Sequence, residues 1–314
     1  MIQEAERSVC RMYSAHPSPG YRDKLAAADR RMELRLHCCG IETADYAGRD
    51  VLDAGCGTGE YAFWFASEGA RVTGIDLSEG SLEEARAYAA EHDPGSVRFE
   101  RRSVLDTGYE PESFDLVYCT GVLHHTPAPY DGFRELCRVL RPGGKILVSL
   151  YHRAGFLPRE LRWRLVRWVA DDDPDDRVRW ARRLFPRTAD RLRDESLDDP
   201  ETRLYDYFGV DRQSLHTIGE ALRWLDRCGL GYRGSFPPAT LSDYPAMFGH
   251  PAYRRVEEEF RGPVQRLLGR LAGPGGMTRS RPGPGSRLAV QLLWLMAGVG
   301  VFSVGGVKPG REEA

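Results

Sequence analysis

The residues of this chain that could do chemistry fall at the ends of short apolar runs. Asp53 ends the first such run and is followed by Gly55, Gly57 and Gly59. Glycines at every second position let the backbone turn sharply, and they let a ligand lie against it where a side chain would clash. Asp76 ends the next apolar run, where a carboxylate can accept hydrogen bonds from both hydroxyls of a ribose. This spacing predicts a nucleoside-binding site.

The elements that must position these residues are a strand, a glycine loop, a helix and a second strand. Val51, Leu52 and Ala54 form an apolar run typical of a strand buried on both faces, with Asp53 in its last turn. A helix is expected over residues 61–66, with Gly69 ending it. Residues 71–75 then predict a second strand, which brings Asp76 to the same edge of the sheet as the glycine loop.

The glycine loop alone leaves the type of nucleoside open. Gly57, Gly59 and Ala62 also satisfy the dinucleotide pattern G-x-G-x-x-A, with Asp76 downstream. Asp53 argues against that reading, because its negative charge would repel a pyrophosphate but would favour a ligand that carries an ammonium group. S-adenosylmethionine has an ammonium group, a sulfonium and no phosphate. The residues from Asp53 to Gly59 resemble the first motif, D-x-G-x-G-x-G, of the class I S-adenosylmethionine-dependent methyltransferases.

The following residues extend this resemblance over roughly residues 48–152. A helix is expected at 78–90 and a third strand at 97–101. In the next segment the family places a carboxylate near the adenine amine, and Asp106 has that position here. Residues 114–126 predict a fourth strand that runs into a loop. Residues 140–151 predict a helix end at Arg141-Pro142-Gly143-Gly144 and then a fifth strand.

The alternation of strands and helices predicts an α/β fold with a doubly wound, mostly parallel, seven-stranded sheet. Helical insertions are expected after the fifth and sixth strands. The resemblance implies S-adenosylmethionine as the cofactor, methyl transfer to a small-molecule acceptor, and a set of cofactor-binding residues. These are Asp53, Gly55, Cys56, Gly57, Gly59, Asp76, Leu77, Leu105, Asp106, Thr120 and Gly121.

Methyl transfer requires a nucleophile held in line with the methyl group, and a base helps when the acceptor is a hydroxyl or a protonated amine. His124 and His125 follow the fourth strand, and Tyr151 and His152 follow the fifth. We predict His125, His124 and Tyr151 as catalytic candidates. Two alternatives remain. One of the two adjacent histidines supports the loop after the fourth strand without acting as a base, and Tyr151 lines the site without taking part in the reaction. Residues expected to contact the acceptor or close the site are Tyr13, Tyr205, Asp206, Tyr207 and His216.

The chain is expected to divide into a core and several additions. An N-terminal helical segment over the cofactor site (1–47) is expected to precede the cofactor-binding core (48–155). A helical insertion or lid (156–213) then precedes a core helix and sixth strand (214–240). The rest is a second insertion (241–286), with a helix at 253–271 and a Gly/Pro-rich loop at 273–286, and a terminal helix, final strand and tail (287–314). In the first segment a helix is expected over 22–37.

Two apolar stretches raise the question of membrane contact. In the first insertion, Leu157, Leu161, Leu165, Trp168 and Val169 share one helical face, with arginines elsewhere. We expect this face to pack on its own domain, with an interfacial membrane helix as the alternative. Residues 288–307 carry no charge. They are expected to form a buried helix and, over 299–308, a final antiparallel strand beside the fifth strand and residues 231–236, rather than a membrane span.

Composition limits the partners. The formal net charge of -2, from 44 basic and 46 acidic residues, gives no reason to expect nucleic acid. The seven cysteines include no CxxC and no zinc-ligand spacing, so no metal is expected and a cytoplasmic location is predicted. No secretory signal is apparent at the start.

Two alternative functions stay open, a membrane-associated lipid methyltransferase with peripheral membrane contact and a non-catalytic cofactor-binding protein. A nicotinamide-dependent oxidoreductase is a remote alternative. Oligomeric state is not predicted.

Overall fold

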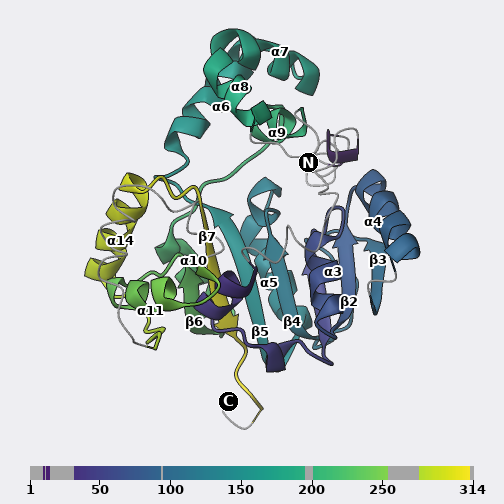
Figure 1. Cartoon of the computed structure of the whole chain (residues 1–314), viewed down its shortest axis with the longest axis vertical. Coiled ribbons are helices and arrows are strands. Elements are labelled where there is room, and N and C mark those ends of the chain that lie inside the picture. The colour runs from purple at the N-terminus through teal and green to yellow at the C-terminus, as the bar shows by residue number, and fades with distance from the viewer. Residues whose placement is uncertain are drawn as a thin grey trace.

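A seven-stranded sheet forms the centre of the protein in a computed structural model (Figure 1). The structure describes residues 10, 12–14, 32–92, 95–194, 201–253 and 276–311. The strand order is β3-β2-β1-β4-β5-β7-β6. The strands are β1 (Asp50–Ala54), β2 (Arg71–Asp76), β3 (Val97–Arg101), β4 (Phe114–Thr120), β5 (Leu140–Tyr151), β6 (Gly231–Phe236) and β7 (Val301–Val307).

The pairing confirms the predicted doubly wound, mostly parallel sheet. The first five strands pair in parallel, whereas β7 is antiparallel to both β5 and β6. The predicted final strand and its partners are therefore confirmed. Because parallel strands end at one edge, Ala54, Asp76, Thr120 and Tyr151 are brought together at the carboxyl edge of the sheet.

Helices cover both faces of the sheet. Alternate residues of β4 enter different clusters, since Leu116 and Tyr118 pack with one and Val117 and Cys119 with the other. The helices are α3 (Glu60–Ser67), α4 (Glu79–His92), α5 (Pro129–Val139), α10 (Ile218–Arg227) and α14 (Pro284–Met296), with residues 32–38 also helical. Short helical turns lie at η1 (Thr43–Asp45), η2 (Leu123–His125) and η4 (Leu241–Asp243), and α11 (Tyr244–Gly249) follows η4.

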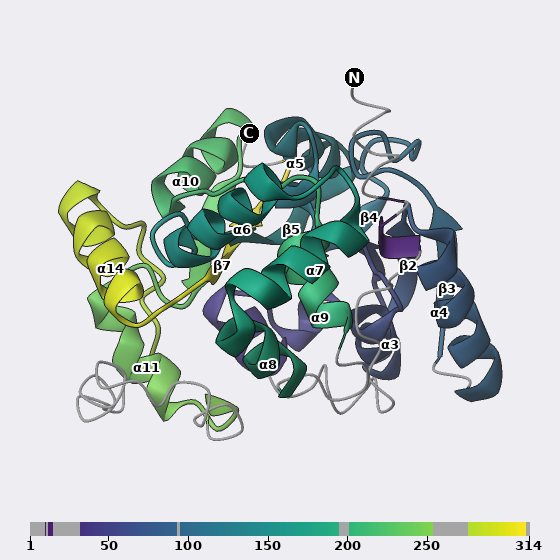
Figure 2. The same ribbon diagram turned by 90° about the horizontal axis from the view of Figure 1, so that it is seen from above.

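The insertion at 156–213 forms a helical lid that stands over the carboxyl edge of the sheet (Figures 1 and 2). It comprises α6 (Leu157–Val169), α7 (Pro174–Leu184), α8 (Pro186–Asp194), α9 (Thr202–Leu204) and the π-helical turn η3 (Tyr205–Gly209). Asp173 caps α7 by accepting a hydrogen bond from the Asp176 amide. The lid has its own apolar cluster, which includes Val166, Val178 and Phe208. This small core gives the lid a fixed underside against the site.

The predicted packing of the apolar face of α6 is wrong. Leu157, Leu161 and Trp168 are 50, 60 and 82% exposed, and Leu165 is also exposed. The buried face of the helix instead carries Val166, with Arg159 and Trp163 on the same side at i, i+4 and i+7 spacing. The Arg159 side chain and the Trp163 indole lie on the inward side of the helix, so Leu157, Leu161 and Leu165 lie on its outer side.

The helix before β5 also ends earlier than expected. α5 ends at Val139, and Leu140 is already extended, so the predicted helix end at residues 141–144 is wrong. Pro142 disfavours helical geometry at Arg141, and Gly143 has a φ of 79°, which fits a turn rather than a helix.

The C-terminal region agrees with the prediction only in part. In α14, Val290, Leu293 and Trp294 are buried, but Leu288, Leu292 and Met296 are exposed, so the helix is amphipathic rather than buried throughout. Within the described ranges, no helix is both long enough and apolar enough to cross a membrane. The predicted helix at 253–271 lies outside the described residues apart from Tyr253, as do residues 22–31 of the N-terminal helix.

Candidate functional site

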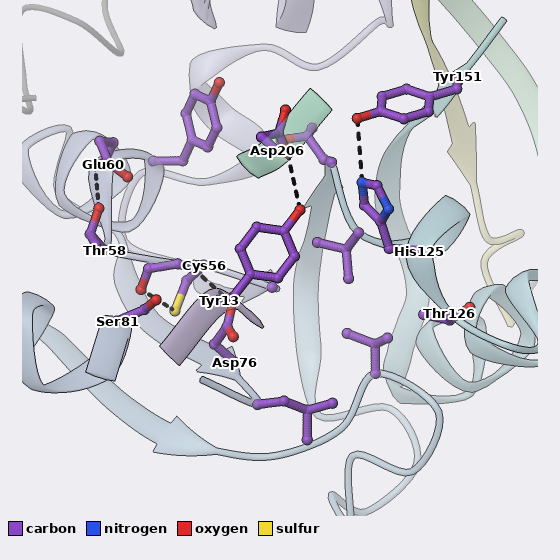
Figure 3. A pocket seen from close by; sticks show the side chains of 18 of the residues that line it. Tyr13, Cys56, Thr58, Glu60, Asp76, Ser81, His125, Thr126, Tyr151 and Asp206 are labelled. Carbon is purple, nitrogen blue, oxygen red and sulfur yellow. Dashed lines mark hydrogen bonds between the residues drawn. The ribbon is translucent and has the colours of Figure 1, made fainter. Parts of the chain in front are cut away.

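A cavity of about 470 Å³ lies where the glycine loop, the strand ends and the lid meet (Figure 3). Its volume is in the range typical of small-molecule sites. Nine of the predicted site residues line it, from four strand ends and their loops. They are Gly55, Cys56, Gly57, Asp76, Leu77, Thr120, Gly121, His125 and Tyr151.

The glycine loop is shaped by two positions with positive φ. Gly55 has a φ of 81°, and a Cβ there would lie 2.0 Å from a methyl group of Val122, so no other residue fits. Gly57 has a φ of 53° and nothing within 4 Å of where its Cβ would be, because it faces the cavity. The amides of Gly55 and Cys56 donate to the Ile75 carbonyl at 2.7 and 2.9 Å, which ties the loop to β2.

Asp76 is held by backbone amides on both carboxylate oxygens. Its Oδ2 accepts from the Gly57 amide at 3.0 Å, and its Oδ1 accepts from the Ser78 amide at 2.8 Å. Burial raises the pKa of Asp76, and these amide hydrogen bonds oppose the rise. Each oxygen keeps a second lone pair, so the fixed carboxylate can still accept from two ligand hydroxyls.

Asp53 is buried at the end of β1, and its Oδ2 has no hydrogen-bond partner. Burial, together with the negative charges of Glu60 and Asp76, raises the pKa of Asp53 well above its usual value. An unpaired buried carboxylate is costly, and a nearby ammonium group would relieve that cost. The orphaned oxygen therefore fits a zwitterionic ligand such as S-adenosylmethionine, although Asp53 itself does not line the cavity.

Other predicted cofactor contacts lie beside the cavity. Gly59 begins α3, and a Cβ there would press on Phe63 and Phe99, so its role in the structure is packing. Leu105 and the exposed Asp106 follow β3, but within the described residues it is Val104 from this segment that lines the cavity. Contact of Leu105 and Asp106 with adenine stays a prediction.

Both ring nitrogens of His125 have hydrogen-bond partners. Its Nδ1 lies 2.9 Å from the Arg212 carbonyl, which can only accept, so Nδ1 carries the proton and Nε2 is the acceptor. The Tyr151 hydroxyl lies 3.3 Å from that Nε2 (Figure 3). Burial raises the pKa of Tyr151, so its hydroxyl donates. Burial also lowers the pKa of His125, which favours the neutral imidazole.

His124 has a different position from its neighbour. It is buried, does not line the cavity, and stacks on the Tyr151 ring with centroids 3.6 Å apart. Burial lowers its pKa well below the usual value. This placement supports the alternative that one of the two histidines holds the loop and the Tyr151 ring. His152 and His216 pair through a β-bridge, and neither they nor Tyr205 line the cavity.

The lid contributes residues that the sequence pattern predicted only in part. The Tyr13 hydroxyl donates to Asp206 Oδ1 at 3.0 Å, joining the N-terminal segment to the lid across the cavity (Figure 3). Tyr207 also lines the cavity, as predicted, but Arg159 and Arg203 were not expected there. The i, i+4, i+7 spacing of Arg159 with the apolar residues Trp163 and Val166 is the signal that would have found it.

Most further lining residues come from segments next to the motifs and could have been found by extending those motifs. They are Thr58, Glu60, Tyr61, Ser81, Arg102, Val104, Val122, Thr126 and Pro127. Leu192, on α8 of the lid, has no such signal. Across the described ranges, no group of three or more histidine, cysteine or acidic side chains could hold a metal ion.

The lining of the cavity has two sides. The loop side comprises Gly55, Gly57, Glu60, Asp76 and Gly121, and the lid side comprises Tyr151, Arg159, Arg203, Asp206 and Tyr207.

A family model described as a methyltransferase domain matches residues 52–148. The chain is 36% identical over 140 residues to methyltransferase GfsG of Streptomyces halstedii, covering 44% of this chain and 49% of that protein. It is 39% identical over 113 residues to a ubiquinone biosynthesis O-methyltransferase of Pseudomonas syringae pv. tomato, covering 36% of this chain and 48% of that protein. The chain thus spans about half the length of the curated relatives it matches.

Among solved structures, PKMT2 from Rickettsia typhi, in complex with AdoHcy, superimposes with a TM-score of 0.57 at 18% identity, covering 91% of this chain and 55% of that one. At that identity the similarity concerns the fold alone.

Proposed function

We propose that this chain, whose residues 52–148 belong to the class I S-adenosylmethionine-dependent methyltransferases, methylates a hydroxyl group of a small molecule. S-adenosylmethionine is the cofactor of this family. The observation that carries the proposal is the glycine loop with Asp76, which together present a fixed carboxylate and an open backbone surface to a cavity beside a neutral histidine.

The loop side would hold the cofactor. Asp76 would accept the ribose hydroxyls, Gly57 would let the ligand lie against the backbone, and Asp53 would balance the ammonium group. When bound, the cofactor supplies a methyl group on an electrophilic sulfonium.

His125 would take the proton of the acceptor. A neutral imidazole with Nδ1 bound to a carbonyl presents Nε2 as a general base, and the Tyr151 hydroxyl marks where an acceptor hydroxyl would donate. A hydroxyl acceptor needs such a base, whereas a thiolate does not. Several relatives are named O-methyltransferases, which agrees with an oxygen acceptor.

The lid would exclude water from this reaction. The hydrogen bond between Tyr13 and Asp206 joins two sides of the cavity, and Arg159 of the lid contacts the ring of Tyr151 at the end of β5. A dry site strengthens the electrostatic contacts within it and prevents loss of the methyl group to water.

The test is calorimetric titration of S-adenosylmethionine and of its demethylated product into wild-type protein, Asp76→Ala and Asp131→Ala. Asp131 is an exposed carboxylate on α5 that pairs with Arg134, so it is a matched control. We expect tight binding to the wild type and to Asp131→Ala, and loss of at least tenfold in affinity in Asp76→Ala. Absence of binding to the folded wild type would rule out the proposal.

We propose a cytoplasmic enzyme whose α6 stripe makes peripheral contact with membranes; the exposed Leu161 and Trp168 and the neighbouring Arg164, which is 70% exposed, support that contact. Cosedimentation with anionic liposomes tests it, and wild-type protein that stays in the supernatant would contradict it. A lipid methyltransferase and a non-catalytic protein are not favoured.

A further inference from the structure

Arg159 lines the cavity, but neither cofactor binding nor proton transfer to His125 uses it. Its side chain is only 13% exposed, which is unusual for a guanidinium on the first turn of a lid helix. A charged group buried in this way is expected to have partners that satisfy its hydrogen bonds. The structure supplies few of them.

The guanidinium of Arg159 has five N–H groups, and the described residues do not satisfy all of them. Its Nη2 donates to the Asp206 carbonyl at 2.6 Å, whereas its Nε is buried without a hydrogen-bond partner. The Asp206 carboxylate lies 3.9 Å from Nη2, beyond hydrogen-bond distance, and accepts from Tyr13 instead. Asp206 therefore pairs with Arg159 by charge, but it leaves the buried Nε donor of Arg159 unsatisfied.

Aromatic rings fix the guanidinium in place. Its central carbon lies 4.4 Å from the centroid of Tyr207, 4.8 Å from that of Phe156 and 5.0 Å from that of Tyr151. These rings attract a cation through their faces, but they cannot accept the in-plane N–H groups as a carboxylate does. The cation is thus held rigidly with donors to spare.

Charge divides across the cavity. The loop side carries Glu60 and Asp76, which suit the cationic cofactor, whereas Arg159 on the lid side keeps a buried Nε without a hydrogen-bond partner. A buried guanidinium with an unsatisfied donor favours a ligand with a negative group at that end. The planar fork of an arginine matches a planar oxyanion with two oxygens.

We propose that Arg159 binds a planar oxyanion, in the simplest case a carboxylate, carried by the methyl acceptor. This inference rests on the proposed function, and it narrows the acceptor to a molecule with an anionic end beside an aromatic or apolar body that the rings of Tyr151 and Tyr207 can cover.

The test compares two probes of nearly equal size, benzoate and the uncharged benzamide. Their dissociation constants are measured by ligand-observed NMR, with and without S-adenosylhomocysteine, for wild type, Arg159→Gln, Arg159→Lys and Arg164→Gln. Arg164 lies on the same helix with its side chain 70% exposed and pairs with Glu160, so it controls for loss of a paired positive charge outside the cavity. We expect the wild type and Arg164→Gln to prefer benzoate by about tenfold, from the usual strength of a charge-assisted hydrogen bond.

The preference should disappear in Arg159→Gln and persist in reduced form in Arg159→Lys, which keeps the charge but not the fork. Equal affinity for the two probes in the wild type, no binding of either, or an unchanged preference in Arg159→Gln would each overturn the inference. Failure of the proposed function is separate, because it would appear as absent binding of S-adenosylhomocysteine in the same samples.

A second measurement does not depend on the variants folding. In the wild type, the affinity for benzoate should fall as the salt concentration rises, while the affinity for benzamide stays constant, because only the first contact is between charges. Affinities for the two probes that respond to salt in the same way would contradict the role of Arg159.

Discussion

The loop side and the lid side of the cavity are built in opposite ways. On the loop side, Gly55, Gly57 and Asp76 lie within 22 residues of one another, and their contacts are largely with backbone amides and carbonyls. On the lid side, Tyr13 donates to Asp206 across 193 residues of sequence, and Arg159 sits among the rings of three other residues. The first side is made by local backbone geometry and the second by distant side chains.

This difference suggests a division of labour. A ligand that is recognised by backbone groups needs the same loop whatever the acceptor is, so the loop side suits a common cofactor. Side chains on a lid can change without disturbing the sheet, so the lid side suits an acceptor that differs between relatives. Substitutions on the two sides should therefore affect different steps.

The largest effect is expected from His125→Ala. Loss of the base should lower turnover by about 10²- to 10⁴-fold, while affinity for S-adenosylhomocysteine stays within about twofold of wild type, because cofactor contacts on the loop side remain. Turnover is measured as release of S-adenosylhomocysteine with an acceptor that the wild type methylates. A variant with wild-type turnover would remove His125 from the mechanism.

Gly57→Val should abolish cofactor binding without unfolding the protein. The new side chain would occupy the cavity, and we expect a loss of affinity of about 100-fold by calorimetry. Gly143→Val is the matched control, because Gly143 also has a positive φ and open space around its Cβ position but lies away from the cavity. Equal losses of affinity in both variants would mean that backbone strain, rather than occupation of the cavity, is responsible.

Tyr13→Phe should produce a smaller change that is confined to the lid side. Removing the hydroxyl breaks the hydrogen bond to Asp206, and a bond to a charged group of this kind corresponds to a change of about tenfold. The KM for the acceptor should rise by that factor, with cofactor affinity unchanged. Kinetics at saturating S-adenosylmethionine separate the two quantities, and a larger change in cofactor affinity than in acceptor KM would contradict the division.

Acidification should destabilise the folded protein. Burial lowers the pKa of His124 and of His125 below the ordinary value of 6.5, so the unfolded chain binds protons first as the pH falls through that value. The stability that is fully present above pH 6.5 is then lost until the pH reaches the folded-state pKa values. Asp53 and Asp76, whose pKa values are raised, oppose this trend.

Between pH 7 and 5.5 we expect Tm to fall by about 3 °C. The slope should be smaller in His124→Asn and unchanged in His92→Asn, since His92 is exposed. A Tm that is constant or rises over this range would show that the carboxyl groups outweigh the histidines.

The smallest effect is expected on the outer face of the lid. Leu161→Ala should change the free energy of unfolding by less than about 0.5 kcal/mol, because the side chain is 60% exposed. Val166→Ala, on the buried face of the same helix, should cost about 1–2 kcal/mol. Denaturant unfolding compares the two variants. A larger loss of unfolding free energy in Leu161→Ala than in Val166→Ala would mean that the outer face of α6 is covered.

The sequence was sufficient for the sheet and the loop side for a physical reason. The strands of the core are apolar runs ended by glycine or acidic residues, and each such signal is contained within a few neighbouring residues. The mostly parallel seven-stranded sheet, the antiparallel β7 and its partners β5 and β6 are confirmed. The cavity-lining positions of Gly55, Gly57 and Asp76 follow from the same local pattern.

The lid could not be predicted in the same way. On α6, the leucines have the periodicity of a buried face, yet the side carrying Arg159 and Trp163 is turned inward, because those long side chains find partners on Asp206 and Val210. Hydrophobic periodicity indicates that a helix has two faces, but it does not say which one meets the rest of the chain. That choice depends on contacts 47 residues away in sequence.

The most direct test of the division is to measure the affinity of S-adenosylhomocysteine for wild type, Gly57→Val and His125→Ala side by side by calorimetry. Binding should be lost in Gly57→Val and should stay within about twofold of wild type in His125→Ala, because only the first change lies on the loop side. Equal loss in both variants, or wild-type affinity in Gly57→Val, would contradict a cofactor site formed by the glycine loop.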